Sequence, residues 1–178
     1  MTFAVIAVIG TIALIGIIVL VPSQKEQIQS SVINELKVLK DKRLWLTLTI
    51  TLFGFSSVFA YFSYISEVLT DVSCVPENLI SYILIIFGIG VTLGNVVGGK
   101  LADWDVNRAL RIIFVLFILY FVALYFIQMN SVVMVAGVFL FGLIGFSMSP
   151  SLQFKSTLVS QDAPTLASTL NQSAFNLG

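Results

Sequence analysis

The chain contains no histidine and only one cysteine, Cys74. Zinc sites, disulfide frameworks and Ser/His or Cys/His catalysis need side chains that this sequence lacks. We therefore expect no metal site, no cofactor and no enzymatic activity.

Charged residues are scarce as well. They make up 10% of the sequence, against about 25% in a typical soluble domain. Apolar residues make up 58%, and the mean hydropathy is +1.03. The formal net charge is zero, without the basic excess that is typical of nucleic-acid binding. This composition predicts an integral membrane protein whose partner is the lipid bilayer and not a nucleic acid.

Long apolar runs dominate the sequence, and five of them are long enough to cross a bilayer as helices. They cover residues 3–21, 44–66, 79–98, 109–128 and 132–148. A sixth pattern, residues 164–178, would reach about 21 Å as a helix, short of the ~30 Å hydrocarbon core. The sequence therefore predicts an all-α bundle of transmembrane helices with an unfinished last span.

Basic residues occur in alternate connections between these spans. Lysine and arginine mark the connections at residues 22–43, 99–108 and 149–164, whereas residues 67–78 and 129–131 contain neither. Basic connections stay on the cytoplasmic side of a membrane. The three basic connections, at residues 22–43, 99–108 and 149–164, are therefore predicted to face the cytoplasm.

The longest polar stretch, residues 22–43, has an apolar face at helical spacing. That face consists of Ile28, Val32, Leu36 and Leu39. The pattern is typical of a helix that lies along the membrane surface, so we expect an amphipathic cytoplasmic linker.

The connection after the third span carries a motif, G-x-L-A-D followed by an arginine. Its members are Gly99, Leu101, Ala102, Asp103 and Arg108. The motif resembles the cytoplasmic loop of the major facilitator superfamily of secondary transporters. That resemblance implies that Asp103 and Arg108 form a cytoplasmic gate that latches one access state.

The sequence departs from the family pattern at three positions of this loop. Trp104 and Asn107 stand where the family mostly has basic residues, and Val106 stands where it mostly has glycine. The alternative is an ordinary cytoplasmic loop that contains an aspartate by chance.

Two further stretches resemble the arabinose efflux permease-like branch of this family. Residues 59–65 resemble its seventh helix, and residues 167–178 resemble its eleventh. The resemblance implies a partial major facilitator fold in the plasma or inner membrane, about helices six to eleven of twelve. Residues 1–21 would be the sixth helix, residues 22–43 the linker and residues 44–178 an incomplete carboxy-terminal bundle.

The branch handles sugars and drugs by proton antiport, so the resemblance also implies a small solute and protons as partners. A missing amino-terminal half of the transporter would be the remaining partner. The span interiors of this sequence contain no acidic residue. Because proton coupling generally uses an ionisable group in the transport path, we expect the coupling acid outside this chain.

Hydroxyl groups form a stripe on the second span. Ser57, Tyr61 and Tyr64 follow Gly54 at helical spacing. Polar groups inside a membrane avoid lipid, which favours a cavity that lines the solute path. Alternatively, the tyrosines belong to the aromatic belt at the outer interface.

Amide side chains mark the last helical pattern. Gln172 and Asn176 share one face with Thr165 and Thr169, and Asn171 lies beside that face. We expect Asn171, Gln172 and Asn176 to contact the solute, although amides of this kind also hold helices together.

Glycines at four-residue spacing follow one face of the third span. Gly90, Gly94 and Gly98 form a small-residue stripe that predicts close packing against another helix.

Two other functions remain open from the sequence. One is a truncated, non-transporting membrane scaffold or assembly subunit. The other is a channel built from small subunits, although a channel favours a continuous polar pore face and polarity here is patchy.

Overall fold

The computed structural model describes residues 2–20, 36–127 and 129–178, and it divides into two units. The first unit, Met1–Ser31, contains α1, Thr2–Leu20. This helix is apolar throughout, and its described side chains are nearly all exposed. The predicted surface helix at residues 22–43 lies mostly outside the described residues.

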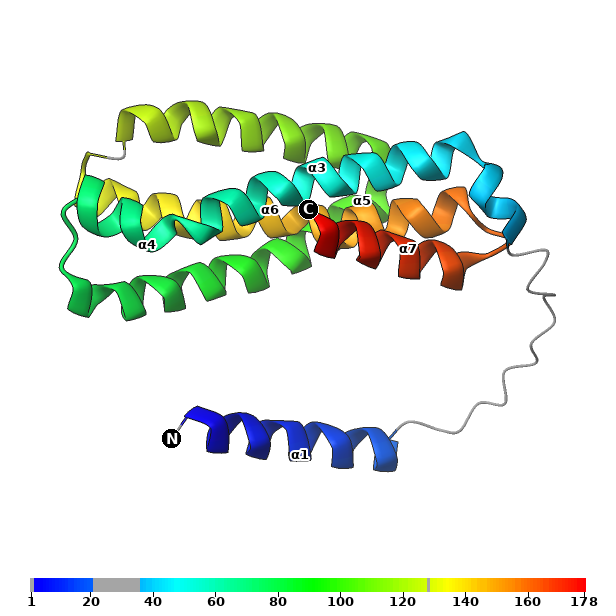
Figure 1. Cartoon of the computed structure of the whole chain (residues 1–178), viewed down its shortest axis with the longest axis horizontal. Coiled ribbons are helices and arrows are strands. Elements are labelled where there is room, and N and C mark those ends of the chain that lie inside the picture. Colours follow the sequence, from blue (N-terminus) through cyan, green and yellow to red (C-terminus); the bar gives the residue numbers. More distant parts are fainter. Residues whose placement is uncertain (1, 21–35, 128) are drawn as a thin grey trace. The chain divides into compact units, whose positions relative to one another are not determined.

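The second unit, Val32–Gly178, is a helical bundle (Figure 1). Its elements are the 3₁₀ turn Lys37–Lys40, α3 (Lys42–Ser63), α4 (Ile65–Glu67), a π-helical turn (Val68–Val72), α5 (Glu77–Ile127), α6 (Ser131–Val159) and α7 (Pro164–Leu177). No strand occurs among the residues described. The all-α bundle is therefore confirmed.

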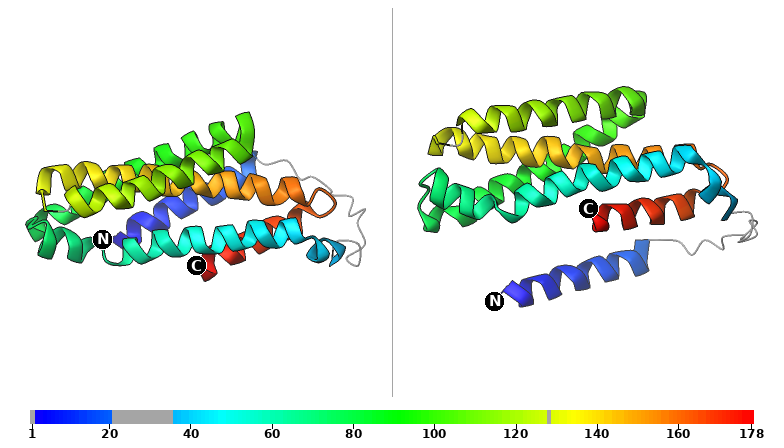
Figure 2. Two further views of the ribbon diagram at one scale, coloured as in Figure 1. Left: turned by 90° about the horizontal axis from the view of Figure 1, so that it is seen from above. Right: turned by 45° about the horizontal axis from the view of Figure 1, so that its top comes forward.

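Helix α5 is two membrane spans joined at one residue. Asp105 has φ −162° and ψ 102°, an extended conformation that breaks the helix. The first segment of α5, residues 77–104, and the second, residues 106–127, lie on different sides of the bundle (Figures 1 and 2). Three helices in the described residues are long and apolar enough to cross a membrane, namely Lys42–Ser63, Glu77–Phe126 and Ser131–Val159. Since α5 doubles back, they correspond to the four predicted spans between residues 44 and 148.

Three predicted loop boundaries are wrong. Residues 67–72 are helical, so the connection predicted at residues 67–78 begins later than expected. Residues 99–104 are helical, so the helix of the third span includes the motif as far as Asp103, and only Asp105 turns the chain. Helix α6 continues through Pro150 to Val159, which leaves residues 160–163 as the connection to α7. Neighbouring helices in a membrane bundle can accommodate a proline inside a helix, so the polar pattern after residue 148 did not end this one.

The first segment of α5 packs closely on α6 because the contact contains glycines. A Cβ added to Gly90, Gly94 or Gly98 would overlap a carbonyl oxygen of α6. On the other side, a Cβ at Gly142 would come within 2.7 Å of the Phe87 carbonyl oxygen. Ser151 donates a hydrogen bond to the Gly98 carbonyl oxygen at 3.1 Å across the same contact. The predicted packing role of the glycine stripe is confirmed.

Helix α7 lies beside α3, as the views of Figure 2 show and as contacts between the two helices require. The rings of Phe175 and Phe55 have centroids 3.9 Å apart. Phe55 is fully buried in the main core together with Phe141 and Met148 of α6. This core holds α3, α6 and α7 together.

Candidate functional site

The connection between the two segments of α5 is built around Asp105. Its Oδ1 accepts hydrogen bonds from the backbone N–H groups of Asn107, at 2.9 Å, and Arg108, at 3.0 Å. An aspartate in this position caps the following helix by satisfying amides that have no partner inside the helix. Sequence reasoning missed this role, although an aspartate immediately before the first residue of a helix is a recognised capping signal.

Arg108 adds an ion pair to the cap. Its Nε lies 3.1 Å from Oδ2 of Asp105, and its guanidinium carbon lies 5.8 Å from the ring centre of Trp104. The backbone N–H of Arg108 contributes most to holding the pKa of Asp105 below its ordinary value. The carboxylate is therefore charged at neutral pH and remains a helix cap.

The predicted gate motif lies on the helix that leads into this turn. Ala102 is buried, Gly99 and Leu101 are half-buried, and Asp103 is exposed. The motif arginine pairs with Asp105 in this structure, two residues after the motif aspartate. The gating role of Asp103 and Arg108 stays a prediction.

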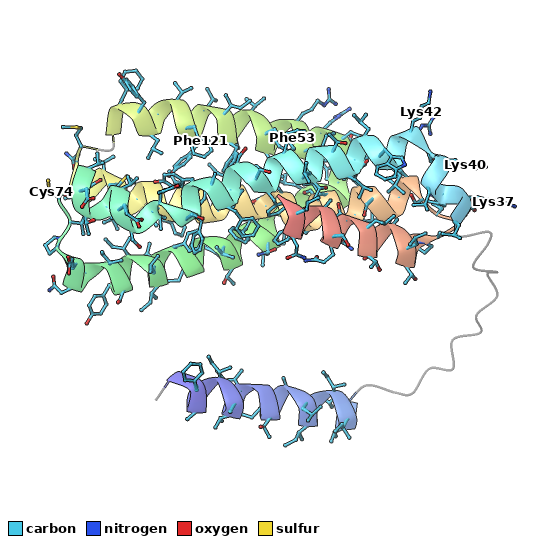
Figure 3. All side chains as sticks on the ribbon, viewed as in Figure 1. Lys37, Lys40, Lys42, Phe53, Cys74 and Phe121 are labelled. Carbon is cyan, nitrogen blue, oxygen red and sulfur yellow. The ribbon has the colours of Figure 1, made fainter. Side chains whose placement is uncertain are left out.

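Three basic connections meet at the same end of the bundle. Lys155 of α6 donates a hydrogen bond to Oδ1 of Asn107 at 2.7 Å, and Nε of Arg111 donates to the Asn107 carbonyl oxygen at 3.2 Å. Figure 3 shows Lys37, Lys40 and Lys42 at this end and Cys74 at the other. We call the first end the basic end. The described basic connections therefore lie together, and their cytoplasmic sidedness stays a prediction.

The hydroxyl stripe on α3 is divided between different surroundings. Ser57 is exposed and lines a groove between α3 and the second segment of α5. Tyr61 is half-buried, and its ring meets the Phe141 ring edge-on at 4.6 Å. Tyr64 is 66% exposed at the end of α3, where an interfacial aromatic residue would lie.

Asn171 belongs to a buried polar network that joins three helices. Thr51 of α3 donates to its Oδ1 at 2.7 Å, and its Nδ2 donates to Oε1 of Gln153 in α6 at 2.8 Å. Gln153 also hydrogen-bonds Ser168 of α7. Both ends of the Asn171 amide are therefore used in contacts between helices.

Gln172 and Asn176 lie on the exposed side of α7. Nδ2 of Asn176 donates to the Gln172 carbonyl oxygen at 2.8 Å, within the helix. Both side chains are open to whatever lies beside this face of the bundle.

The six predicted solute-lining residues do not surround one cavity within the described part of the chain. Two adjoining grooves, of about 680 and 510 Å³, instead run between α3 and the second segment of α5. Across residues 2–20, 36–127 and 129–178, no group of acidic or sulfur-containing side chains is arranged to hold a metal ion.

The doubled-back spans and the basic end define a helical, multi-pass membrane protein. The chain belongs to the Major Facilitator Superfamily, because the model of that family matches residues 1–178.

Curated relatives match nearly the full length of this chain. The chain is 30% identical to the inner membrane transport protein YdhP of Escherichia coli (strain K12), with 100% of this chain and 46% of YdhP covered. It is 26% identical to the putative transporter AraJ of the same strain, with 99% and 45% covered. It is 27% identical to a probable sugar efflux transporter of Mannheimia succiniciproducens, with 99% and 45% covered.

The chain therefore spans just under half the length of these relatives. No solved structure matches it significantly.

Proposed function

We propose that this chain is the carboxy-terminal portion of a secondary transporter that exports a small solute, such as a sugar or a drug, by alternating access. The observation that carries the proposal is the family match along the whole chain, on a bundle of doubled-back spans. The relatives include proteins named as a sugar efflux transporter and a chloramphenicol resistance protein. Both names agree with export.

Alternating access requires that each half of a transporter moves as a rigid piece. The glycine contact between α5 and α6 supports such rigidity, because backbones that touch cannot slide without collision. The buried network at Asn171 adds α7 and α3 to the same piece.

We assign the solute contact mainly to side chains that this rigid piece leaves exposed. Gln172 and Asn176 of α7 are the main candidates, with exposed Ser57 and Tyr64 and half-buried Tyr61 as further ones. Asn171 would act through helix contacts, since both ends of its amide are already hydrogen-bonded.

We assign the cytoplasmic gate to the turn at Asp105. Asp103 is exposed beside the ion pair between Arg108 and Asp105, so an arginine from the opposite half could bridge to it in one access state. When the halves rock apart, that bridge would break while the Asp105 cap stays intact.

Proton coupling would use an acid outside this chain. The acidic residues of the described part lie at helix ends or in connections: Asp41, Glu67, Asp71, Glu77, Asp103, Asp105 and Asp162. A carboxylate in the middle of a span would cost about 2.5–3.5 kcal/mol to insert, and this bundle avoids that cost.

The test is transport by a version extended to the length of the relatives, in inside-out vesicles with an imposed proton gradient. The proposal predicts gradient-driven uptake of a sugar or drug by the extended version and none by this chain alone. Gln172→Ala should raise KM, with Ser173→Ala as an exposed control on the same helix.

Three outcomes would contradict the proposal. Voltage-dependent currents from this chain would indicate a channel, and the absence of flux from the extended version would indicate a scaffold. Loss of proton coupling on neutralising an acid of this chain would place the coupling group here.

A further inference from the structure

The larger groove opens at the basic end of the bundle. Arg43 of α3, Arg111 of α5 and Lys155 of α6 line it, and no acidic side chain does. Asn107 holds two of these cations, because its Oδ1 accepts from Lys155 and its carbonyl oxygen accepts from Arg111. An ammonium has three N–H donors and a guanidinium has five, so both cations keep donors that can reach an anion.

Below these cations the groove is apolar. Its walls include Leu46 and Ile50 of α3 and Val115 and Ile118 of α5, which are between 37% and 63% exposed. Side chains of this kind suit contact with an acyl chain.

The second groove continues the first. Both are lined by Ile50, Phe114 and Ile118, and the second extends to Phe53 and Phe121. Figure 3 shows Phe53 and Phe121 between α3 and the second segment of α5.

The joined grooves match one leaflet in depth. Phe121 lies ten residues after Arg111, a rise of about 15 Å along the helix, which is half of the ~30 Å hydrocarbon core. A lipid whose phosphate lies at the basic end would therefore place its acyl chain along the grooves.

We propose that these grooves bind an anionic phospholipid of the cytoplasmic leaflet, with its headgroup phosphate held by Arg43, Arg111 and Lys155. Basic pockets between helices on this side of a membrane favour anionic headgroups over zwitterionic ones. The site does not depend on the transport activity proposed above.

The test is native mass spectrometry of the whole chain, purified in detergent and mixed with equal amounts of phosphatidylglycerol and phosphatidylcholine. We expect retained phosphatidylglycerol in preference to phosphatidylcholine. Neutralising the three cations in the triple variant Arg43→Gln, Arg111→Gln, Lys155→Gln should lower retention by about tenfold or more.

The matched control removes the same charge from the same end. Lys40, Lys42 and Lys100 are exposed and do not line either groove. Their triple change to glutamine should leave retention within about twofold of the unchanged chain. Arg111→Lys, which keeps the charge, should retain most of the lipid. The triple variant Arg43→Gln, Arg111→Gln, Lys155→Gln should keep the size-exclusion profile of the unchanged chain, so its loss of lipid does not come from misfolding.

Four results would overturn the proposal. They are equal retention of the two lipids, equal loss in both triple variants, displacement of the lipid by glycerol 3-phosphate, and a dimer mass in place of a lipid adduct. A version extended to the length of the relatives should also keep the lipid, and its failure to do so would make a protein segment the occupant.

Discussion

The two sides of this bundle differ in how closely their helices approach. Between the first segment of α5 and α6, glycines bring backbone against backbone, and added methyl groups would overlap carbonyl oxygens. Between α3 and the second segment of α5, large side chains hold the helices apart and leave grooves of about 680 and 510 Å³. The contrast indicates that the first side is a permanent contact and that the second is available to another molecule.

The largest expected effect comes from breaking the close side. Gly94→Leu would drive a side chain into the backbone of α6 near Leu143, so the bundle must separate or shift. Overpacking of this kind costs about 3 kcal/mol or more. Thermal unfolding in detergent, followed by size-exclusion chromatography, should show a lower midpoint.

Gly88→Leu on the same segment is the matched control. Nothing lies within 4 Å of a Cβ at Gly88, so its midpoint should stay close to that of the unchanged chain. Equal losses for the two variants would mean that helix propensity, and not packing, sets the result.

A smaller effect should separate the buried and open faces of the second α5 segment. Ile113 is 1% exposed, whereas Ile118 is 63% exposed in the groove. Ile113→Ala should lower the free energy of unfolding by about 2 kcal/mol, the low end for such truncations. Ile118→Ala should change it by about 0.5 kcal/mol or less. Denaturation in mixed micelles measures both, and a larger loss at Ile118 would contradict the assignment of that face.

The network at Asn171 should contribute less again. Asn171→Ala removes hydrogen bonds to α3 and α6 and should cost about 1 kcal/mol, because hydrogen bonds between membrane helices contribute about 0.6–2 kcal/mol. Gln172→Ala, one residue along and exposed, should be nearly neutral in the same assay. Equal, near-zero effects of the two variants would mean that Asn171 serves only the solute.

The smallest effect is local to the turn. Asp105→Ala should speed hydrogen exchange at the amides of Asn107 and Arg108, which lose their acceptor. Asp103→Ala should leave that exchange unchanged while lowering transport by the extended version. Because the pKa of Asp105 is below its ordinary value, the cap should persist to acidic pH and fail only when this carboxylate is protonated. A loss of protection, measured against the intrinsic exchange rate at each pH, between pH 7 and pH 5 would contradict this.

Sequence patterns predicted the spans and the close contact because both depend on short-range features. Apolar runs set where a chain can cross a bilayer, and glycines every four residues set where a helix can touch another. The motif and the basic connections also predicted that residues 99–108 and 149–164 lie at the same end of the bundle. The hydrogen bond from Lys155 to Asn107 agrees with this.

The rest depended on contacts between distant residues. A polar run such as residues 99–104 is typical of a loop, yet here the first segment of α5 continues through it. The helix breaks only at Asp105, which caps the second segment. The role of Asn171 followed from Thr51 and Gln153, which no local pattern connects to it. The grooves likewise arise from how α3 lies against α5, which sequence spacing does not determine.

Thiol labelling of intact cells tests most directly whether the bundle crosses the membrane with its basic end inside. Cys74 is exposed at the opposite end, so an impermeant maleimide should modify it from outside. A Cys74→Ser, Lys100→Cys variant should react only after the cells are permeabilised. Labelling of Lys100→Cys from outside, together with protection of Cys74, would contradict the topology on which this account rests.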